Sequence, residues 1–270
     1  MSNYKMICLD IDGTLLNSEH KITKVTKEVI QNVALEKEIP VILVSARMPK
    51  GILFLLEELN IEQPIICYSG AYVLDRGTPL VDITIPVEDV KQVCHLARAA
   101  GVHVSLYKED QWYIADMDQW AKQESEITNI EPTIINFDDL LDLWAKDKSG
   151  PNKILCMAEP ASIKLLNSAL KDTLSNKLNI YPSKPTYLEI MPATASKPSA
   201  IELLCKKFNL SSSEVIAIGD NYNDINMIEY AGLGVAMENA PEEVKRYADY
   251  ITLTNDEDGV AEAIKLHVLE

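Results

Sequence analysis

The sequence lacks the features that mark secreted, membrane-spanning and zinc-binding proteins. Its five cysteines are scattered and form no CxxC pair, which argues against a disulfide framework. No His/Cys cluster offers a zinc site. No apolar run reaches the roughly 18 residues needed to cross a bilayer, and the chain begins without the consecutive basic, apolar and cleavage segments of a signal peptide. We therefore expect a cytoplasmic protein with reduced thiols.

Positive charge is also scarce in this chain. The 270 residues include 25 Lys and Arg against 41 Asp and Glu, which gives a formal net charge of −16. A surface of this sign argues against nucleic acid and anionic membrane as partners. If the ligand is an anion, local cations must overcome the repulsion of the whole chain. The composition leaves the oligomeric state open.

The stretch 6–16 organises the rest of the chain. An apolar run at 6–9 reads as a buried strand that ends at Asp10 and Asp12, followed by Gly13. Side chains at i and i+2 of an extended segment point to the same face, so both carboxylates can act on one ligand. Open α/β sheets bind ligands at this carboxyl end of their strands. Gly13 allows the backbone to turn sharply and to approach a ligand closely.

The first and last thirds of the chain alternate strand and helix patterns. Apolar runs at 6–9, 40–45 and 64–68 are separated by amphipathic segments with helical spacing, and the alternation returns after Pro192. Buried strands that alternate with helices predict an α/β fold, with a parallel sheet covered by helices.

The middle third has a different pattern, with short, half-polar strands and hairpins typical of an α+β insert with its own core. One hairpin joins 102–107 to 111–115. We therefore predict a core domain formed by residues 1–85 and 189–270, interrupted by an insert at 86–188.

Polar side chains follow several strands of the core domain. Ser45 follows the second strand and Asp220 follows a strand at 214–219. Since the carboxyl ends of parallel strands share one edge, these residues should converge with Asp10 and Asp12. Carboxylates from separate strands suit Mg²⁺, which prefers oxygen ligands.

Lys197 lies before a helix that we expect at 200–208, opened by the capping-box pattern Ser199-x-x-Glu202. Lys197, Ser45 and backbone N–H groups near Asp12 and Ala46 could hold a phosphate dianion. The chemistry expected of such a site is attack of one carboxylate on phosphorus while the other carboxylate manages the leaving-group proton.

These residues resemble the four motifs of the haloacid dehalogenase superfamily of phosphatases, and the mid-chain insert resembles the large cap of its Cof-type subfamily. The resemblance covers the whole chain and implies a Rossmann-like core, an α+β cap, Mg²⁺ as cofactor and a small phosphorylated metabolite, such as a sugar phosphate, as substrate. The matching segments are Asp10-x-Asp12-Gly13-Thr14-Leu15-Leu16, Ser45, Lys197 and Gly219-Asp220-Asn221-x-Asn223-Asp224.

The resemblance also implies roles for individual residues. Asp10 would be the nucleophile that forms an aspartyl-phosphate, and Asp12 would protonate the leaving alkoxide and then activate water. Mg²⁺ would be held by Asp10, the Asp12 carbonyl and Asp220. Asp224 would complete the site, either through a water or by orienting Lys197. The residues expected to contact phosphate or substrate are Ile11, Gly13, Ser45, Ala46, Arg47, Lys197 and Asn223.

The chain departs from the subfamily pattern at three places. It has Ser45-Ala46-Arg47 where Thr-Gly-Arg is common, Ser69-Gly70-Ala71 where Asn-Gly-Ala is common, and Lys197-Pro198 where Lys-Gly is usual. Proline removes one backbone N–H and fixes φ. We expect these changes to affect substrate contacts more than the chemistry.

Two other functions are compatible with this pattern. One is a phosphotransferase of the phosphomutase kind, which returns the phosphoryl group to a sugar instead of water. The other is a non-catalytic metabolite-binding regulator on the same fold. Release of free phosphate would separate a phosphatase from both alternatives.

Overall fold

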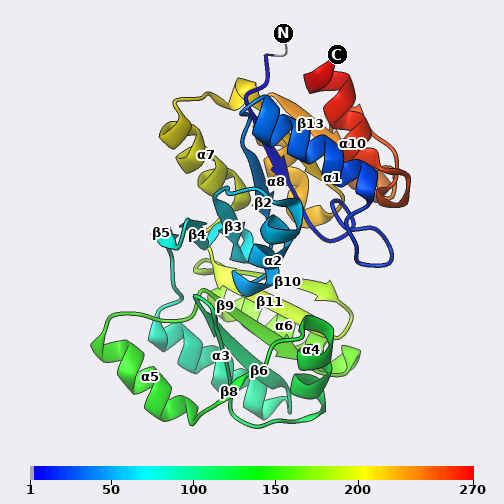
Figure 1. The fold of residues 1–270 in the computed structure, drawn as a ribbon. Coiled ribbons are helices and arrows are strands. Elements are labelled where there is room, and N and C mark those ends of the chain that lie inside the picture. The colour runs from blue at the N-terminus through cyan, green and yellow to red at the C-terminus, as the bar shows by residue number, and fades with distance from the viewer. Residues whose placement is uncertain (1–2) are drawn as a thin grey trace. The chain divides into compact units, whose positions relative to one another are not determined.

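A computed structural model describes residues 3–270, which fall into two compact units (Figure 1). The core unit joins the chain up to Leu80 with Ser196–Glu270, and the insert unit is Val81–Ala195. The junctions therefore lie several residues from the predicted ones. The reason at the second junction is strand β11 (Tyr187–Pro192), which pairs with strands of the insert over its whole length.

The core unit is built on an 8-stranded sheet in the order β14-β13-β12-β1-β2-β3-β4-β5. The pairings from β14 to β3 are parallel, and β4 turns back antiparallel to β3. The central strands are completely apolar and buried, as a sheet with helices on both faces requires. The strands are β1 (Met6–Leu9), β2 (Val41–Val44), β3 (Ile65–Cys67), β4 (Tyr72–Asp75), β5 (Thr78–Asp82), β12 (Val215–Gly219), β13 (Leu233–Ala236) and β14 (Tyr250–Ile251).

Helices lie on either side of this sheet (Figure 1). Helix α1 packs beside α10, and α7 packs beside α8. The helices are α1 (Lys24–Gln31), α2 (Lys50–Leu59), α7 (Lys197–Phe208), α8 (Ile225–Tyr230), α9 (Glu242–Lys245) and α10 (Gly259–Ile264). Short π and 3₁₀ turns are η1 (Asn32–Glu36), η2 (Tyr68–Gly70), η3 (Ser212–Glu214), η4 (Tyr222–Asp224), η5 (Asn255–Glu257) and η6 (Lys265–Leu269).

Helix α7 begins earlier than the capping-box pattern predicted. The Ser196 side chain accepts the N–H of Ser199 and caps the helix, so that Lys197 is its first residue. The prediction that Ser199 is the cap is therefore wrong. The difference matters because Lys197 is now held by regular helical structure instead of a loop.

The insert unit has its own 6-stranded sheet in the order β10-β11-β9-β6-β7-β8. Its pairings are antiparallel except for the parallel pair of β7 with β8. The strands are β6 (His103–Lys108), β7 (Gln111–Ile114), β8 (Thr133–Ile134), β9 (Lys153–Met157), β10 (Leu178–Lys184) and β11. The helices are α3 (Val87–Ala99), α4 (Gln119–Thr128), α5 (Phe137–Lys146) and α6 (Pro160–Leu174).

Helix α4 is an element that the sequence analysis did not predict. Only Ala121 among its residues is buried, so the helix shows no apolar stripe that a periodicity argument could detect. Its signal is the cap, because the Asp118 side chain accepts the N–H groups of Trp120 and Ala121.

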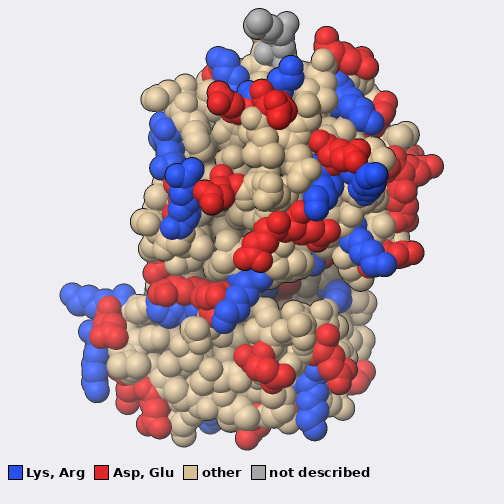
Figure 2. All heavy atoms as spheres, viewed as in Figure 1, with Lys and Arg blue, Asp and Glu red and all other residues tan. Residues whose placement is uncertain are grey.

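Acidic and basic side chains alternate on the face seen in Figure 2, in both units. The negative surplus of the chain is thus spread over solvated surface there. Among residues 3–270, no helix is long and apolar enough to cross a membrane.

A substitution in the apolar core of the insert should destabilise the insert. Leu170 on α6 is completely buried in that core, whereas Leu165 on the same helix is 70% exposed. We expect Leu170→Ala to lower the free energy of unfolding of the insert by about 2–5 kcal/mol and Leu165→Ala to change it by less than about 0.5 kcal/mol. Tryptophan fluorescence during urea unfolding measures this, because all three tryptophans lie in the insert. Equal effects of the two variants would contradict the packing described.

Candidate active site

Three strands of the core unit bring their carboxyl ends to one edge of the sheet. Strand β1 lies between β2 and β12, with Leu9 in register with Leu43 and Ile218. The next residue, Asp10, continues the ladder by donating its N–H to the Ile218 carbonyl at 3.0 Å. Asp10, Ser45 and Asp220 are therefore brought together by strand pairing, as the sequence predicted.

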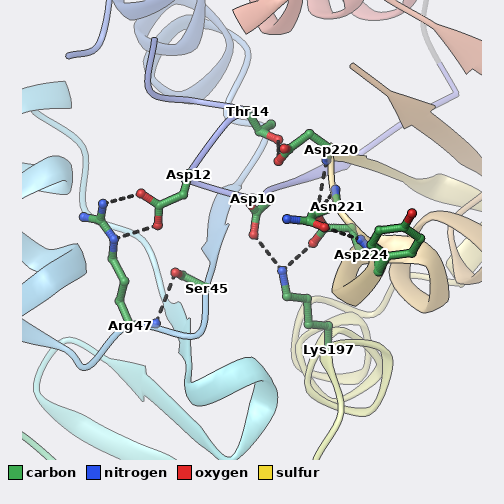
Figure 3. Close-up of polar contacts among 10 residues, drawn as sticks. Asp10, Asp12, Thr14, Ser45, Arg47, Lys197, Asp220, Asn221 and Asp224 are labelled. Atoms are coloured by element: carbon green, nitrogen blue, oxygen red, sulfur yellow. Dashed lines mark hydrogen bonds and ion pairs between the residues drawn. The ribbon is translucent and has the colours of Figure 1, made fainter. Parts of the chain in front are cut away.

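Lys197 lies at the centre of this group of side chains. Its Nζ atom is 2.7 Å from Asp10 Oδ1 and 2.5 Å from Asp224 Oδ1 (Figure 3). The three side chains are between 0% and 9% exposed. Burial lowers the pKa of Lys197, but the carboxylates of Asp10 and Asp224 outweigh it and leave the pKa raised. The lysine is therefore a permanent cation at the predicted nucleophile.

Asp224 holds Lys197 and is itself held by the backbone. Its second oxygen, Oδ2, accepts the N–H groups of Asp220 at 3.1 Å and Asn221 at 2.9 Å. A Cβ atom at Gly219 would collide with the Asp224 side chain, so only glycine fits there. Of the two roles considered for Asp224, the observed contacts match the orientation of Lys197.

Carboxylate oxygens of Asp10, Asp220 and Asp224 all lie within 4.8 Å of one another. Burial, then the Asp224 charge, raises the pKa of Asp10 well above its usual range, although Lys197 opposes the shift. The same two causes raise the pKa of Asp220 to about 7. An all-oxygen donor set whose charges repel one another fits a hard divalent cation such as Mg²⁺. The Asp12 carboxylate lies outside this cluster, so the predicted contact of Asp12 with metal could come only from its carbonyl.

Asp12 and Arg47 form a bidentate ion pair. Arg47 donates from Nε to Asp12 Oδ2 at 2.9 Å and from Nη2 to Asp12 Oδ1 at 2.6 Å (Figure 3). Ser45 is buried beside them, and its hydroxyl accepts the Arg47 backbone N–H at 3.2 Å. The structure thus brings Arg47 and Ser45 together with Asp12, as expected for a shared site.

The remaining predicted contact residues differ in exposure. Ile11 is completely buried and can contribute only its backbone to a ligand. Ala46 and Gly13 are partly exposed. Asn223 is exposed in η4, and no side-chain hydrogen bond within residues 3–270 joins it to the other site residues. These contacts stay predictions.

Thr14 and Asn239 support the site, and the sequence analysis gave neither of them a role. Thr14 is buried and donates its hydroxyl to Asp220 Oδ1 at 3.0 Å. Asn239, which follows β13, donates to the Gly13 carbonyl at 2.8 Å. At Gly13, where φ is +83°, a Cβ atom would collide with the Asp220 carboxylate. Thr14 belongs to the first motif, which is a local signal for a role in the site, whereas Asn239 has no local signal.

Comparisons with known proteins agree with this geometry. A family model described as haloacid dehalogenase-like hydrolase matches residues 7–264. The chain belongs to the haloacid dehalogenase-like hydrolase family. The family, the hydrolase class and the α/β fold predicted from the sequence are thereby confirmed.

Three relatives show how far the similarity extends. A Haemophilus influenzae protein named as a candidate phosphatase is 35% identical over 96% of this chain and 96% of its own length. A Bacillus subtilis 5-amino-6-(5-phospho-D-ribitylamino)uracil phosphatase is 32% identical over 98% of this chain and 96% of its own length. A solved structure described as a sugar phosphatase of subclass IIB is 26% identical, covers 97% of this chain and 98% of its own, and superposes with a TM-score of 0.82.

The local structure of this hydrolase explains one of its departures from the family pattern, Pro198, and one residue that it shares with that pattern, Gly70. Pro198 lies in the first turn of α7, where backbone N–H groups have no intrahelical partner, so the proline removes no hydrogen bond. Gly70, with φ at +103°, lies against the Ser196 carbonyl, and a Cβ atom would collide with it. The glycine in Ser69-Gly70-Ala71 is thus required by the packing against the start of α7.

Asp220 gives the hydrolase a specific pH dependence of stability. Its pKa in the folded protein is raised from 3.8 to about 7, so the folded state retains a proton that the unfolded chain has released. The stability contributed by Asp220 is therefore present below about pH 4 and is lost as the pH rises to about 7. In EDTA, the Tm of Asp220→Asn relative to wild type should increase steadily from pH 4 to pH 7.

Asp256→Asn is the matched control. Hydrogen bonds from Ser18 lower the pKa of Asp256 below 3.8, so above about pH 5 this group is ionised in both the folded and the unfolded state. Its relative Tm should stay constant between about pH 5 and pH 7, where that of Asp220→Asn should still increase. A constant difference for Asp220→Asn as well would show that Asp220 is not stabilised in its protonated form.

Proposed function

We propose that this hydrolase is a Mg²⁺-dependent phosphatase that hydrolyses small phosphorylated metabolites, with sugar and sugar-alcohol phosphates as the substrate class. The observation that carries the proposal is Asp10, a carboxylate at the carboxyl end of a central strand with the Lys197 ammonium at 2.7 Å. Two relatives support the substrate class, since one is named as a phosphatase of a phosphorylated ribityl compound and another as a sugar phosphatase.

The first half of the reaction assigns one role to each carboxylate. An Asp10 oxygen attacks phosphorus, the bond from phosphorus to the alcohol oxygen breaks, and the Asp12 carboxyl gives its proton to the leaving oxygen. Lys197 carries the positive charge that favours the ionised form of Asp10, against burial and the Asp224 charge, which raise the pKa of that carboxyl. The product of this half is an aspartyl-phosphate at Asp10 and a free alcohol.

The second half returns the enzyme to its starting state. Asp12, now a carboxylate, takes a proton from water as the water oxygen attacks phosphorus, and the bond from phosphorus to Asp10 breaks. Lys197, which lies 2.7 Å from Asp10, and the Ser45 hydroxyl would hold the phosphate oxygens throughout. A cation held by Asp10, Asp220 and the Asp12 carbonyl would neutralise the charge of the phosphoryl group.

Asp10 should be essential for turnover. Asp10→Asn is nearly isosteric but removes the nucleophile, and phosphate monoesters are among the slowest reactions in water. We expect release of inorganic phosphate from p-nitrophenyl phosphate and a panel of sugar phosphates to fall by more than about 100-fold. Asp142→Asn, an exposed acid on α5, should retain wild-type activity. An active Asp10→Asn, or phosphate that appears on an acceptor sugar instead of in solution, would contradict the proposal.

Activity should depend on a divalent cation held by the acid cluster. Excess EDTA should abolish phosphate release and added Mg²⁺ should restore it, while Asp220→Ala should raise the Mg²⁺ concentration needed for half-maximal activity by about tenfold or more. As a measurement independent of activity, Mg²⁺ should raise the Tm of the wild type at pH 7 more than that of Asp220→Ala. Full activity in EDTA, or stoichiometric zinc that survives dialysis, would rule out this assignment.

A further inference from the structure

All three nitrogens of the Arg47 guanidinium donate hydrogen bonds, to Asp12 and to the start of helix α2. Two of its nitrogens donate to the two oxygens of Asp12, and the third, Nη1, donates to the Gly51 carbonyl at 3.0 Å. Within residues 3–270, the side-chain hydrogen bonds to the Asp12 carboxylate both come from Arg47. This differs from the phosphate contact that the family resemblance implies for Arg47.

The arginine is itself fixed at both ends. Its backbone N–H donates to the Ser45 hydroxyl, and its carbonyl accepts the Tyr68 N–H at 3.2 Å. A Cβ atom at Gly51 would lie 3.3 Å from the Arg47 Cβ atom, so the glycine leaves just enough room for the arginine stem over the first turn of α2. The side chain is 27% exposed. Arg47 is therefore held through its backbone and its side chain, and it can hold the Asp12 carboxylate in one orientation.

Asp12 needs a contact that fixes the orientation of its carboxylate. Its own side chain is 54% exposed, and an exposed carboxylate is free to adopt several rotamers. A proton donor must be held within hydrogen-bond reach of the leaving oxygen, and a misplacement of about 1 Å can cost about 100-fold in rate. A planar guanidinium that binds both oxygens fixes the plane of the carboxylate as well as its position, and each oxygen keeps a second lone pair on which the transferred proton can be carried.

We propose that Arg47 is a positioning residue for Asp12, which acts through the proton transfers of that carboxylate and not as a ligand of the phosphate. The inference rests on the proposed phosphatase function, because it assigns Asp12 the proton transfers. It makes Arg47 a determinant of which leaving groups the enzyme accepts. Alcohols that leave poorly depend on a well-placed proton, whereas activated phenols leave without one.

The first test compares leaving groups. Arg47→Met should reduce kcat/KM for glucose 6-phosphate, or for the most rapidly hydrolysed sugar phosphate of the panel, by about 10–100-fold. It should leave p-nitrophenyl phosphate within about threefold of wild type. The loss should appear in kcat more than in KM. Arg76→Met, at a 74% exposed arginine of the same unit, should leave both substrates unchanged.

The second test is a double-mutant cycle between the two residues. If Arg47 acts only through Asp12, then Arg47→Met in an Asp12→Asn background should cost less than about threefold beyond Asp12→Asn alone. If Arg47 binds the phosphate, the two losses should multiply, and Arg47→Met should slow p-nitrophenyl phosphate as much as the sugar phosphate. Either of these two results would overturn the proposal.

Two controls keep the tests decisive. If Arg47→Met does not fold, as judged by circular dichroism and Tm, Arg47→Lys takes its place and should show the same leaving-group pattern, because an ammonium cannot bind both oxygens and Gly51 at once. The failure of the phosphatase function would be recognised separately, by an Asp10→Asn variant that keeps its activity. An inactive Asp10→Asn with multiplying Arg47 and Asp12 losses would overturn the role of Arg47 alone.

Discussion

The site depends on one buried cation. Lys197 lies between Asp10 and Asp224 with almost no exposure to water, and an unpaired charge at this depth would cost several kcal/mol. Each of the three charged groups can therefore be buried only because the other two are present. Acids outnumber the lysine in this arrangement, since Asp10, Asp224 and the neighbouring Asp220 surround one lysine. The surplus of negative charge is what suits the site to a divalent cation.

The fold supplies this interaction from three separate parts of the core unit. Asp10 follows the central strand β1, Asp224 follows β12 through the turn η4, and Lys197 begins helix α7 after the insert. Their sequence separations are 187 and 27 residues, so no local segment can form the ion pairs alone. The glycines at 13 and 219 permit the close approach, because any side chain there would occupy the space of Asp220 or Asp224.

The two predicted catalytic carboxylates are kept in different environments. Asp10 is buried against a lysine, whose charge favours the anion and opposes the rise in pKa caused by burial and Asp224. Asp12 is exposed and held by the Arg47 guanidinium from the loop after β2, an environment compatible with the proposed proton transfers to a leaving oxygen and from water. Two acids that are two residues apart thus have different environments, as the different roles proposed for them require.

The sequence by itself determined the α/β core, the insert and the residues at the strand ends, because apolar periodicity and the two acidic motifs are local signals. It did not predict helix α4, whose only marker is its cap, nor the start of α7 at Lys197. Only the tertiary structure decided which contacts these side chains make: Asp224 with Lys197, Asn239 with the Gly13 carbonyl and Arg47 with Asp12. Contacts of this kind join residues that are distant in the chain, and their geometry is fixed by strand pairing and packing, which leave no trace in the spacing of residues.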